Sequence, residues 1–161
     1  MIGEKKALEM IEKILWMTEE YVQLAAMPKH YGTGDLFHNL DIHIIHTIGK
    51  NRGINVTGLA RKHSISKSAV SQAIAKLQRR GLVRRYQVPE NRKEVLFELT
   101  DRGERAFEAH LDFHMRAETP YINELARFSR EESAMVEKVI DLLMRRARHV
   151  RTLISNKEAE E

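Results

Sequence analysis

Apolar side chains recur every three to four residues over three long segments of the chain, the spacing of amphipathic helices. The first segment covers residues 4–26 and the second covers residues 40–48. The third opens with a capping box at residues 129–132 and carries its apolar stripe over residues 136–154. Residues 29–39 are polar and contain two glycines, which predicts a loop between the first two helices.

Two shorter helices are expected in the middle of the chain. Thr57 is a candidate N-cap for a helix over residues 58–63, and Ser66 is a candidate N-cap for the next one. The inner face of that second helix is Val70, Ile74 and Leu77. Gly81 is predicted to end it in the left-handed conformation.

After Gly81 the apolar pattern changes from a helical period to alternation. Residues 82–88 and 94–99 are predicted strands, joined by a turn over residues 89–93. A further helix should start at Asp101 and be bent or interrupted at Pro120.

Two short helices, a tight turn and a two-stranded hairpin follow the order of a winged helix-turn-helix. The predicted fold is therefore mostly α with a small β wing. Residues 40–118 form the winged lobe, residues 1–28 and 120–155 are flanking helices, and residues 156–161 are a disordered tail. A length of 161 residues favours a single domain overall.

Charge is segregated along the chain, although the net charge is only +4. Residues 42–89 contain no Asp or Glu but ten cationic side chains: Lys50, Arg52, Arg61, Lys62, Lys67, Lys76, Arg79, Arg80, Arg84 and Arg85. A polyanion such as the phosphate backbone of nucleic acid would neutralise this density. The alternative is a solvated basic face without a partner.

The helix that follows Ser66 carries small polar and basic side chains opposite its apolar face. The candidate DNA-binding residues are Ser66, Lys67, Ser68, Ser71, Gln72 and Lys76. Gln72 can pair bidentately with adenine, the serines can bond bases or phosphates, and Lys67 lies at the positive end of the helix dipole. Arg92 and Lys93 in the hairpin turn are candidates for an adjacent minor groove.

Over nearly its whole length the chain resembles the MarR family of bacterial and archaeal transcription regulators. The resemblance rests on residues 56–60 (VTGLA), 66–71 (SKSAVS), 77–83 (LQRRGLV) and 94–103 (EVLFELTDRG). It implies a homodimer in which the N- and C-terminal helices interleave and two recognition helices meet a palindromic operator. The long apolar stripes at both ends fit this dimer, since monomers rarely leave large apolar patches exposed.

The wing departs from the pattern of that family. The family's wing usually carries Asp-x-Arg, whereas the matching positions here are Asn91, Arg92 and Lys93. The acid that orients the wing arginine is therefore missing.

Histidines supply the candidate ligand site. His110 and His114 are four residues apart on one predicted helix, a spacing that suits zinc. Zinc-sensing members of the resembled family imply a set of His43, His110, His114 and the carboxylate of Glu20, with His46 as an extra candidate. Two alternatives stay open: histidines that only hydrogen-bond within the protein, and an organic effector bound in a cleft.

The chain contains no cysteine, which excludes thiol sensing and thiolate metal sites. It also shows no signal peptide or membrane span, so a cytoplasmic protein is expected. No phosphate-binding loop, serine elbow or paired-carboxylate motif is present, and an enzyme is not expected. The predicted function is a DNA-binding regulator, most simply a repressor, with a metal or small-molecule effector. The alternative is an architectural DNA-binding protein.

Overall fold

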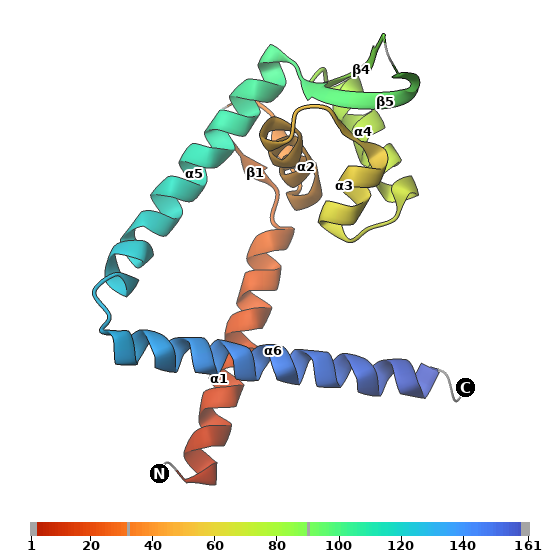
Figure 1. The fold of residues 1–161 in the computed structure, drawn as a ribbon. Coiled ribbons are helices and arrows are strands. Elements are labelled where there is room, and N and C mark those ends of the chain that lie inside the picture. The colour runs from red at the N-terminus through yellow and green to blue at the C-terminus, as the bar shows by residue number, and fades with distance from the viewer. Residues whose placement is uncertain (1–2, 32, 90, 159–161) are drawn as a thin grey trace. The chain divides into compact units, whose positions relative to one another are not determined.

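The computed structural model describes residues 3–31, 33–89 and 91–158. These residues form two compact units that divide after His114. Figure 1 shows the helices and strands: most of the described residues are helical, and the strands are short. None of the helices in the described ranges combines the length and apolar character needed to cross a bilayer.

The first helix, α1 (Glu4–Ala26), has the bounds that the apolar period predicts. None of its side chains is buried. Trp16 is 66% exposed, Tyr21 66% and Val22 69%, although the stripe to which they belong is apolar. The helix therefore presents a hydrophobic surface that the rest of its own unit, up to His114, does not cover.

The prediction of a loop between the first two helices is wrong in part. Two short antiparallel strands, β1 (Lys29–His30) and β2 (Leu36–Phe37), form a hairpin there. Tyr31 and Phe37 are buried in the core, which gives this segment a hydrophobic anchor at each side. Single apolar residues in a polar segment do not produce a strand pattern, so the hairpin could not be predicted from the sequence.

The core lies around α2 (Asn39–Lys50). Four of its isoleucines are at most 1% exposed: Ile42, Ile44, Ile45 and Ile48. The helix ends at Lys50, two residues after the end that the apolar pattern predicts. A Cβ at Gly49 would fall 2.8 Å from Cδ2 of Phe107, so the glycine allows Phe107 to pack closely against α2.

The helix-turn-helix consists of α3 (Val56–His63) and α4 (Lys67–Arg79). Asn55, not Thr57, caps α3, since its Oδ1 accepts the amide of Gly58 at 2.7 Å. Ser66 caps α4 as predicted, accepting the amide of Ala69 at 3.1 Å. Gly81 follows α4 with φ +68°, which confirms the left-handed end.

Three strands form the wing sheet in the order β3 (Ile54–Asn55), β5 (Asn91–Leu99) and β4 (Val83–Val88). Both neighbouring pairs are antiparallel. The strand β5 starts three residues before the predicted Glu94. Phe97 and Leu99 are buried as their alternation predicts, but Val95, farther along the hairpin, is 37% exposed.

Two long helices complete the chain. The helix α5 (Asp101–Leu125) continues past Pro120, so the predicted interruption does not occur. The helix α6 (Arg130–Glu158) begins at the predicted capping box, in which Ser129 and Glu132 bond each other's backbone amides. It extends to residue 158, and residues 159–161 of the predicted tail lie outside the described ranges.

Candidate nucleic-acid interface and histidine cluster

The helix α4 has two chemically distinct faces. Val70, Ala73, Ile74 and Leu77 are buried in the core. On the other side Lys67, Ser68, Ser71 and Gln72 are exposed, as predicted from the sequence. Two hydroxyls already serve the helix, since Ser66 caps it and Ser71 donates to the carbonyl of Lys67 at 2.8 Å. The exposed face offers one ammonium, one carboxamide and small hydroxyls to a partner.

Lys76 lies at the edge of this face and is turned toward the protein. Its Nζ is 2.6 Å from Oδ2 of Asp41, a side chain of α2 that is only 4% exposed. The sequence prediction grouped Lys76 with the DNA-binding residues. In the structure its ammonium neutralises a buried carboxylate and holds α4 to α2, because a buried charge is stable only when it is paired.

A second set of ion pairs holds the 29–37 hairpin to the lobe. Arg80 follows α4 and lies 3.2 Å from Asp35 and 3.6 Å from Asp41. Its guanidinium also stacks on Phe37, 4.5 Å from the ring centre. Arg102 of α5 bonds Asp35 at 2.9 Å and the carbonyl of Arg80 at 3.1 Å. The acid-free stretch is therefore partly neutralised by acids that precede it.

Three histidines from two helices come together. His43 of α2 and His110 and His114 of α5 each offer a ring nitrogen, and these atoms lie within 4.8 Å of one another. The Nε2 atoms of His110 and His114 are 3.0 Å apart. All three candidate histidines are thus brought into one cluster.

His110 is the buried member of this histidine cluster. It is 2% exposed, and Tyr31 packs edge-on against its ring at 5.2 Å. Burial lowers the pKa of His110 to about 3, with further contributions from the charges of His114, His46 and His43. Burial also lowers the pKa of His43. Neutral imidazoles are the form that binds metal ions.

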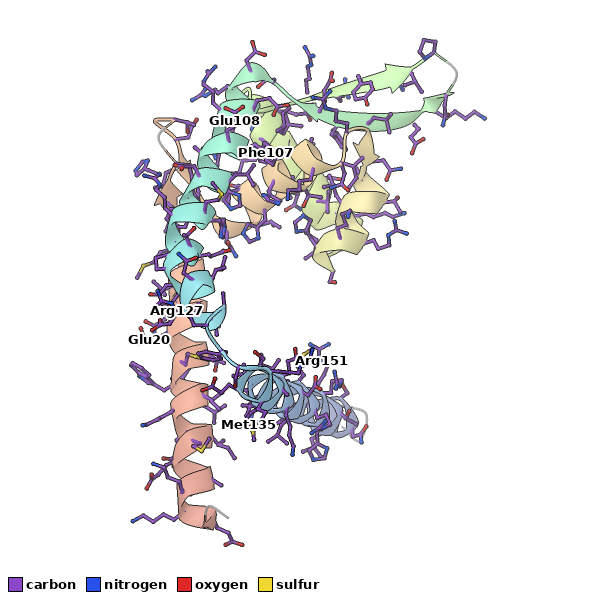
Figure 2. The ribbon with its side chains drawn as sticks, turned by 60° about the vertical axis from the view of Figure 1, so that its left-hand side comes forward. Glu20, Phe107, Glu108, Arg127, Met135 and Arg151 are labelled. Carbon is purple, nitrogen blue, oxygen red and sulfur yellow. The ribbon has the colours of Figure 1, made fainter. Side chains whose placement is uncertain are left out.

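His46 and Glu20 stand apart from the cluster in different ways. His46 does not belong to the group of close nitrogens, but its Nδ1 is 3.2 Å from Nδ1 of His110. Glu20 is exposed on α1, where Figure 2 labels it. The group found among the described residues contains no carboxylate, so a ligand role of Glu20 stays a prediction.

Comparison with known proteins decides the family. The model of the MarR family matches residues 39–95, which include α2, the helix-turn-helix and most of the wing. The uncharacterized HTH-type transcriptional regulator YhjH of Bacillus subtilis is 31% identical over 117 residues, covering 73% of this chain and 67% of that protein. The chain belongs to the MarR family.

Another relative of this MarR-family protein is the HTH-type transcriptional regulator PchR of Bacillus subtilis, 38% identical over 102 residues. The match covers 63% of this chain and 60% of PchR, so the chain spans less than two thirds of that relative. Among solved structures, the zinc-responsive MarR family member ZitR of Lactococcus lactis superimposes with a TM-score of 0.72. It is 18% identical and covers 87% of this chain and 98% of its own, which establishes a common fold.

The wing of this MarR-family protein is organised around Glu94. Asn55, the cap of α3, and Asn91, at the start of β5, both donate their side-chain amides to the carboxylate of Glu94. Asn91 thus binds an acid where the family pattern has an acid. Lys93 is exposed, and the side chain of Arg92 lies outside the described part of the structure.

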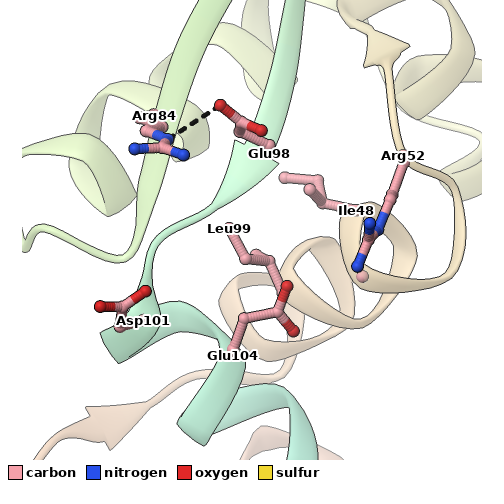
Figure 3. A pocket seen from close by; sticks show the side chains of 8 residues that line it. Ile48, Arg52, Arg84, Glu98, Leu99, Asp101 and Glu104 are labelled. Atoms are coloured by element: carbon pink, nitrogen blue, oxygen red, sulfur yellow. Dashed lines mark hydrogen bonds and ion pairs between the residues drawn. The ribbon is translucent and has the colours of Figure 1, made fainter.

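A hollow of about 200 Å³ lies where the wing meets α5 (Figure 3). Arg84 and Glu98 pair across the wing strands at 2.8 Å, and Asp101 and Glu104 lie on the first turn of α5. Arg52 faces them from the segment after α2. The hollow is lined by three carboxylates and two guanidinium groups, so it disfavours an anion, whereas the cationic surface of α4 favours one.

Proposed function

We propose that this MarR-family protein regulates transcription by binding double-stranded DNA sequence-specifically through α4. The observation that carries the proposal is the exposed polar face of α4 within a winged helix-turn-helix. A helix of this kind fits the major groove, where a carboxamide such as that of Gln72 can recognise adenine and small hydroxyls allow close approach. Lys67 at the first turn is placed to meet a phosphate.

The charges of the surrounding surface support DNA as the partner. Exposed cations surround the exposed face of α4: Arg61 and Lys62 on α3, Arg79 on α4, and Lys93 on the wing. Acids in the same lobe are largely engaged: Asp35 and Asp41 pair with arginine and lysine, and Glu94 is held by two asparagines. Exposed cations on α3, α4 and the wing are therefore available to an anionic partner, while Asp35, Asp41 and Glu94 are engaged within the protein.

We further propose that the binding species is a homodimer formed by the flanking helices. Apolar side chains on α1 and α6 are exposed, including Val22 at 69%, Met135 at 60% and Ile154 at 55%. Exposed apolar area on this scale marks an interaction surface. A second copy of the chain supplies two recognition helices for the two halves of a palindromic site.

The histidine cluster is proposed to bind zinc and to control DNA affinity. Zn–N bonds of about 2.0–2.1 Å place two ligands of a tetrahedral ion about 3.4 Å apart. The nitrogens of His110 and His114 are 3.0 Å apart and all three lie within 4.8 Å, so small side-chain rotations suffice. Zinc would bind the three ring nitrogens, of which those of His43 and His110 are kept neutral by burial, which lowers the pKa of both side chains. A fourth position is left for Glu20 or water.

Zinc at this position would join two helices. His43 belongs to α2 of the lobe, and His110 and His114 belong to α5. A ligand that binds one arrangement of α2 and α5 more tightly shifts the population toward it. Because α4 is ion-paired to α2 through Lys76 and Asp41, the position of the recognition helix follows that of α2.

The groove assignment is tested by two single variants of the full chain. Gln72→Ala should relax base preference at one position of each half-site, by about 1–3 kcal/mol of discrimination. Lys67→Ala should weaken binding to all sequences about equally. It should also reduce the slope of log affinity against log salt concentration by roughly one, because one phosphate contact is lost.

The measurement is fluorescence anisotropy on a promoter fragment, on single-base variants of it and on scrambled DNA. Glu137→Ala on α6, an exposed side chain remote in sequence from α3 and α4, is the control. Equal behaviour of the Gln72 and Lys67 variants would refute the assignment of α4 to the major groove.

A further inference from the structure

His46 is not one of the proposed zinc ligands, but it is in hydrogen-bond contact with the ligand His110. His46 lies three residues after His43 on α2, and its Nδ1 faces Nδ1 of His110 at 3.2 Å. The other ring nitrogen of His110, Nε2, faces Nε2 of His114 at 3.0 Å. His110 therefore has a partner at each ring nitrogen, with the candidate ligand His114 at its Nε2 and His46 at its Nδ1.

The two contacts of His110 constrain where its single proton resides. A neutral imidazole has one N–H donor and one acceptor nitrogen. If Nδ1–H of His110 donates to Nδ1 of His46, its Nε2 carries the lone pair and accepts from Nε2–H of His114. This tautomer is also the one that a metal at Nε2 of His110 requires. Of His110 and His114, only His114 then has to change its tautomer when a metal binds.

Packing holds the ring of His46 in this orientation. His46 is stacked at a tilt against Phe107 of α5, with ring centres 5.6 Å apart, and edge-on against His110 at 5.2 Å. Phe107 is in turn packed against Gly49, where a Cβ would overlap it. Both neighbours of His46 thus come from α5, the helix that carries two of the candidate ligands.

We propose that His46 is a positioning residue for the metal site, which accepts the Nδ1 proton of His110 and so presents Nε2 of His110 to the ion. This inference rests on the proposed zinc site. Partners of this kind fix the tautomer and ring orientation of a ligating histidine, and their loss weakens metal binding by about 10- to 100-fold.

Two substitutions separate this hydrogen bond from simple packing. His46→Leu keeps an apolar side chain against Phe107 but removes the acceptor. The Nδ1–H of His110 then has no partner, and the competing tautomer places a proton on Nε2, where the metal should bind. His46→Asn keeps an acceptor, since its Oδ1 takes the position of Nδ1. His149→Leu, exposed on α6, is the matched control.

Zinc affinity of the full chain is measured by competition with a chromophoric chelator, and tetrahedral coordination by the visible absorption of bound Co²⁺. We expect the Leu variant to bind zinc about 10- to 100-fold more weakly. The Asn variant and the His149 control should bind like the wild type. Wild-type affinity in the Leu variant would overturn the proposal, as would an Asn variant as weak as the Leu variant.

The tautomer is read independently by two-bond ¹⁵N–¹H NMR correlations in the metal-free wild-type protein, which needs no variant to fold. The proposal requires the proton of His110 on Nδ1, and a proton on Nε2 would overturn it. A wild-type protein that takes up no zinc would instead overturn the zinc part of the proposed function. The NMR result distinguishes these two failures.

Discussion

At the scale of single residues, His110 and Lys76 show which contacts a sequence can indicate. The spacing of His110 and His114 suggested a joint site, because residues four apart share a helix face. Their approach to His43 and the bond to His46 depend on how α5 packs on α2, which no local pattern encodes. In the same way, the partner of Lys76 is Asp41, 35 residues away and just outside the acid-free stretch.

The pH dependence of stability follows from the burial of His110. Its pKa is lowered to about 3 in the folded protein, against an ordinary value of 6.5, and the pKa values of His43 and His46 are lowered too. Between the folded and unfolded values the unfolded chain binds more protons. Stability of the metal-free protein is therefore full above about pH 6.5 and falls as the pH decreases below it.

The loss of stability is measured by urea unfolding with a chelator present, between about pH 7.5 and 5.5. Most carboxylates stay ionised over this pH range, so histidines dominate the change. His110→Leu should make the decrease of the midpoint with falling pH shallower than in the wild type. A variant that loses stability with the same slope would contradict the assignment to His110.

At the scale of elements, patterns with a strong period or a local capping partner were predicted well. The bounds of α1, the cap at Ser66 and the capping box at Ser129 agree with the sequence. The hairpin at 29–37 was missed because its anchors, Tyr31 and Phe37, are isolated apolar residues stabilised by tertiary packing. At Asn55 and Thr57, two good capping residues lie within one turn, and the sequence does not rank them.

The junction of the wing with α5 should be sensitive to a single methyl group. A Cβ at Gly103 would overlap the backbone carbonyl oxygen of Leu82, which also accepts a hydrogen bond from the amide of Thr100. Gly103→Ala should destabilise the protein by roughly 1–3 kcal/mol or more, because the helix must shift away from the wing.

Thermal or urea unfolding checks the Gly103 prediction. Gly3→Ala is the control, since nothing lies within 4 Å of a Cβ at Gly3. If both alanine variants were as stable as the wild type, the close packing of α5 on the Leu82 carbonyl would be incorrect.

At the scale of the whole molecule, the distribution of apolar surface is the main feature. The core gathers around α2 and the helix-turn-helix, while α1 and α6 bury none of their described side chains. The sequence predicted these apolar stripes and their dimeric role. The structure identifies which apolar side chains are exposed. The contacts of a dimer depend on a second copy of the chain.

Disrupting the apolar face of α1 should dissociate the homodimer. Val22→Glu places a charge on a side chain that is 69% exposed in the single chain and that a partner would bury. We expect a monomer in sedimentation velocity and loss of tight binding to a two-site operator. Lys13→Glu, exposed on the same helix, should remain dimeric. A dimeric Val22 variant would exclude this face from the interface.

The proposed function is DNA binding by a MarR-family lobe under the control of a histidine-bound zinc ion. Its most direct test is the affinity of the full chain for its own promoter fragment and for scrambled DNA, first with chelator and then with micromolar zinc. We expect zinc to change the affinity for the promoter by about tenfold, to leave the affinity for scrambled DNA unchanged, and to have no effect in the His110→Ala/His114→Ala variant. Promoter affinity that is the same with chelator and with zinc would contradict it.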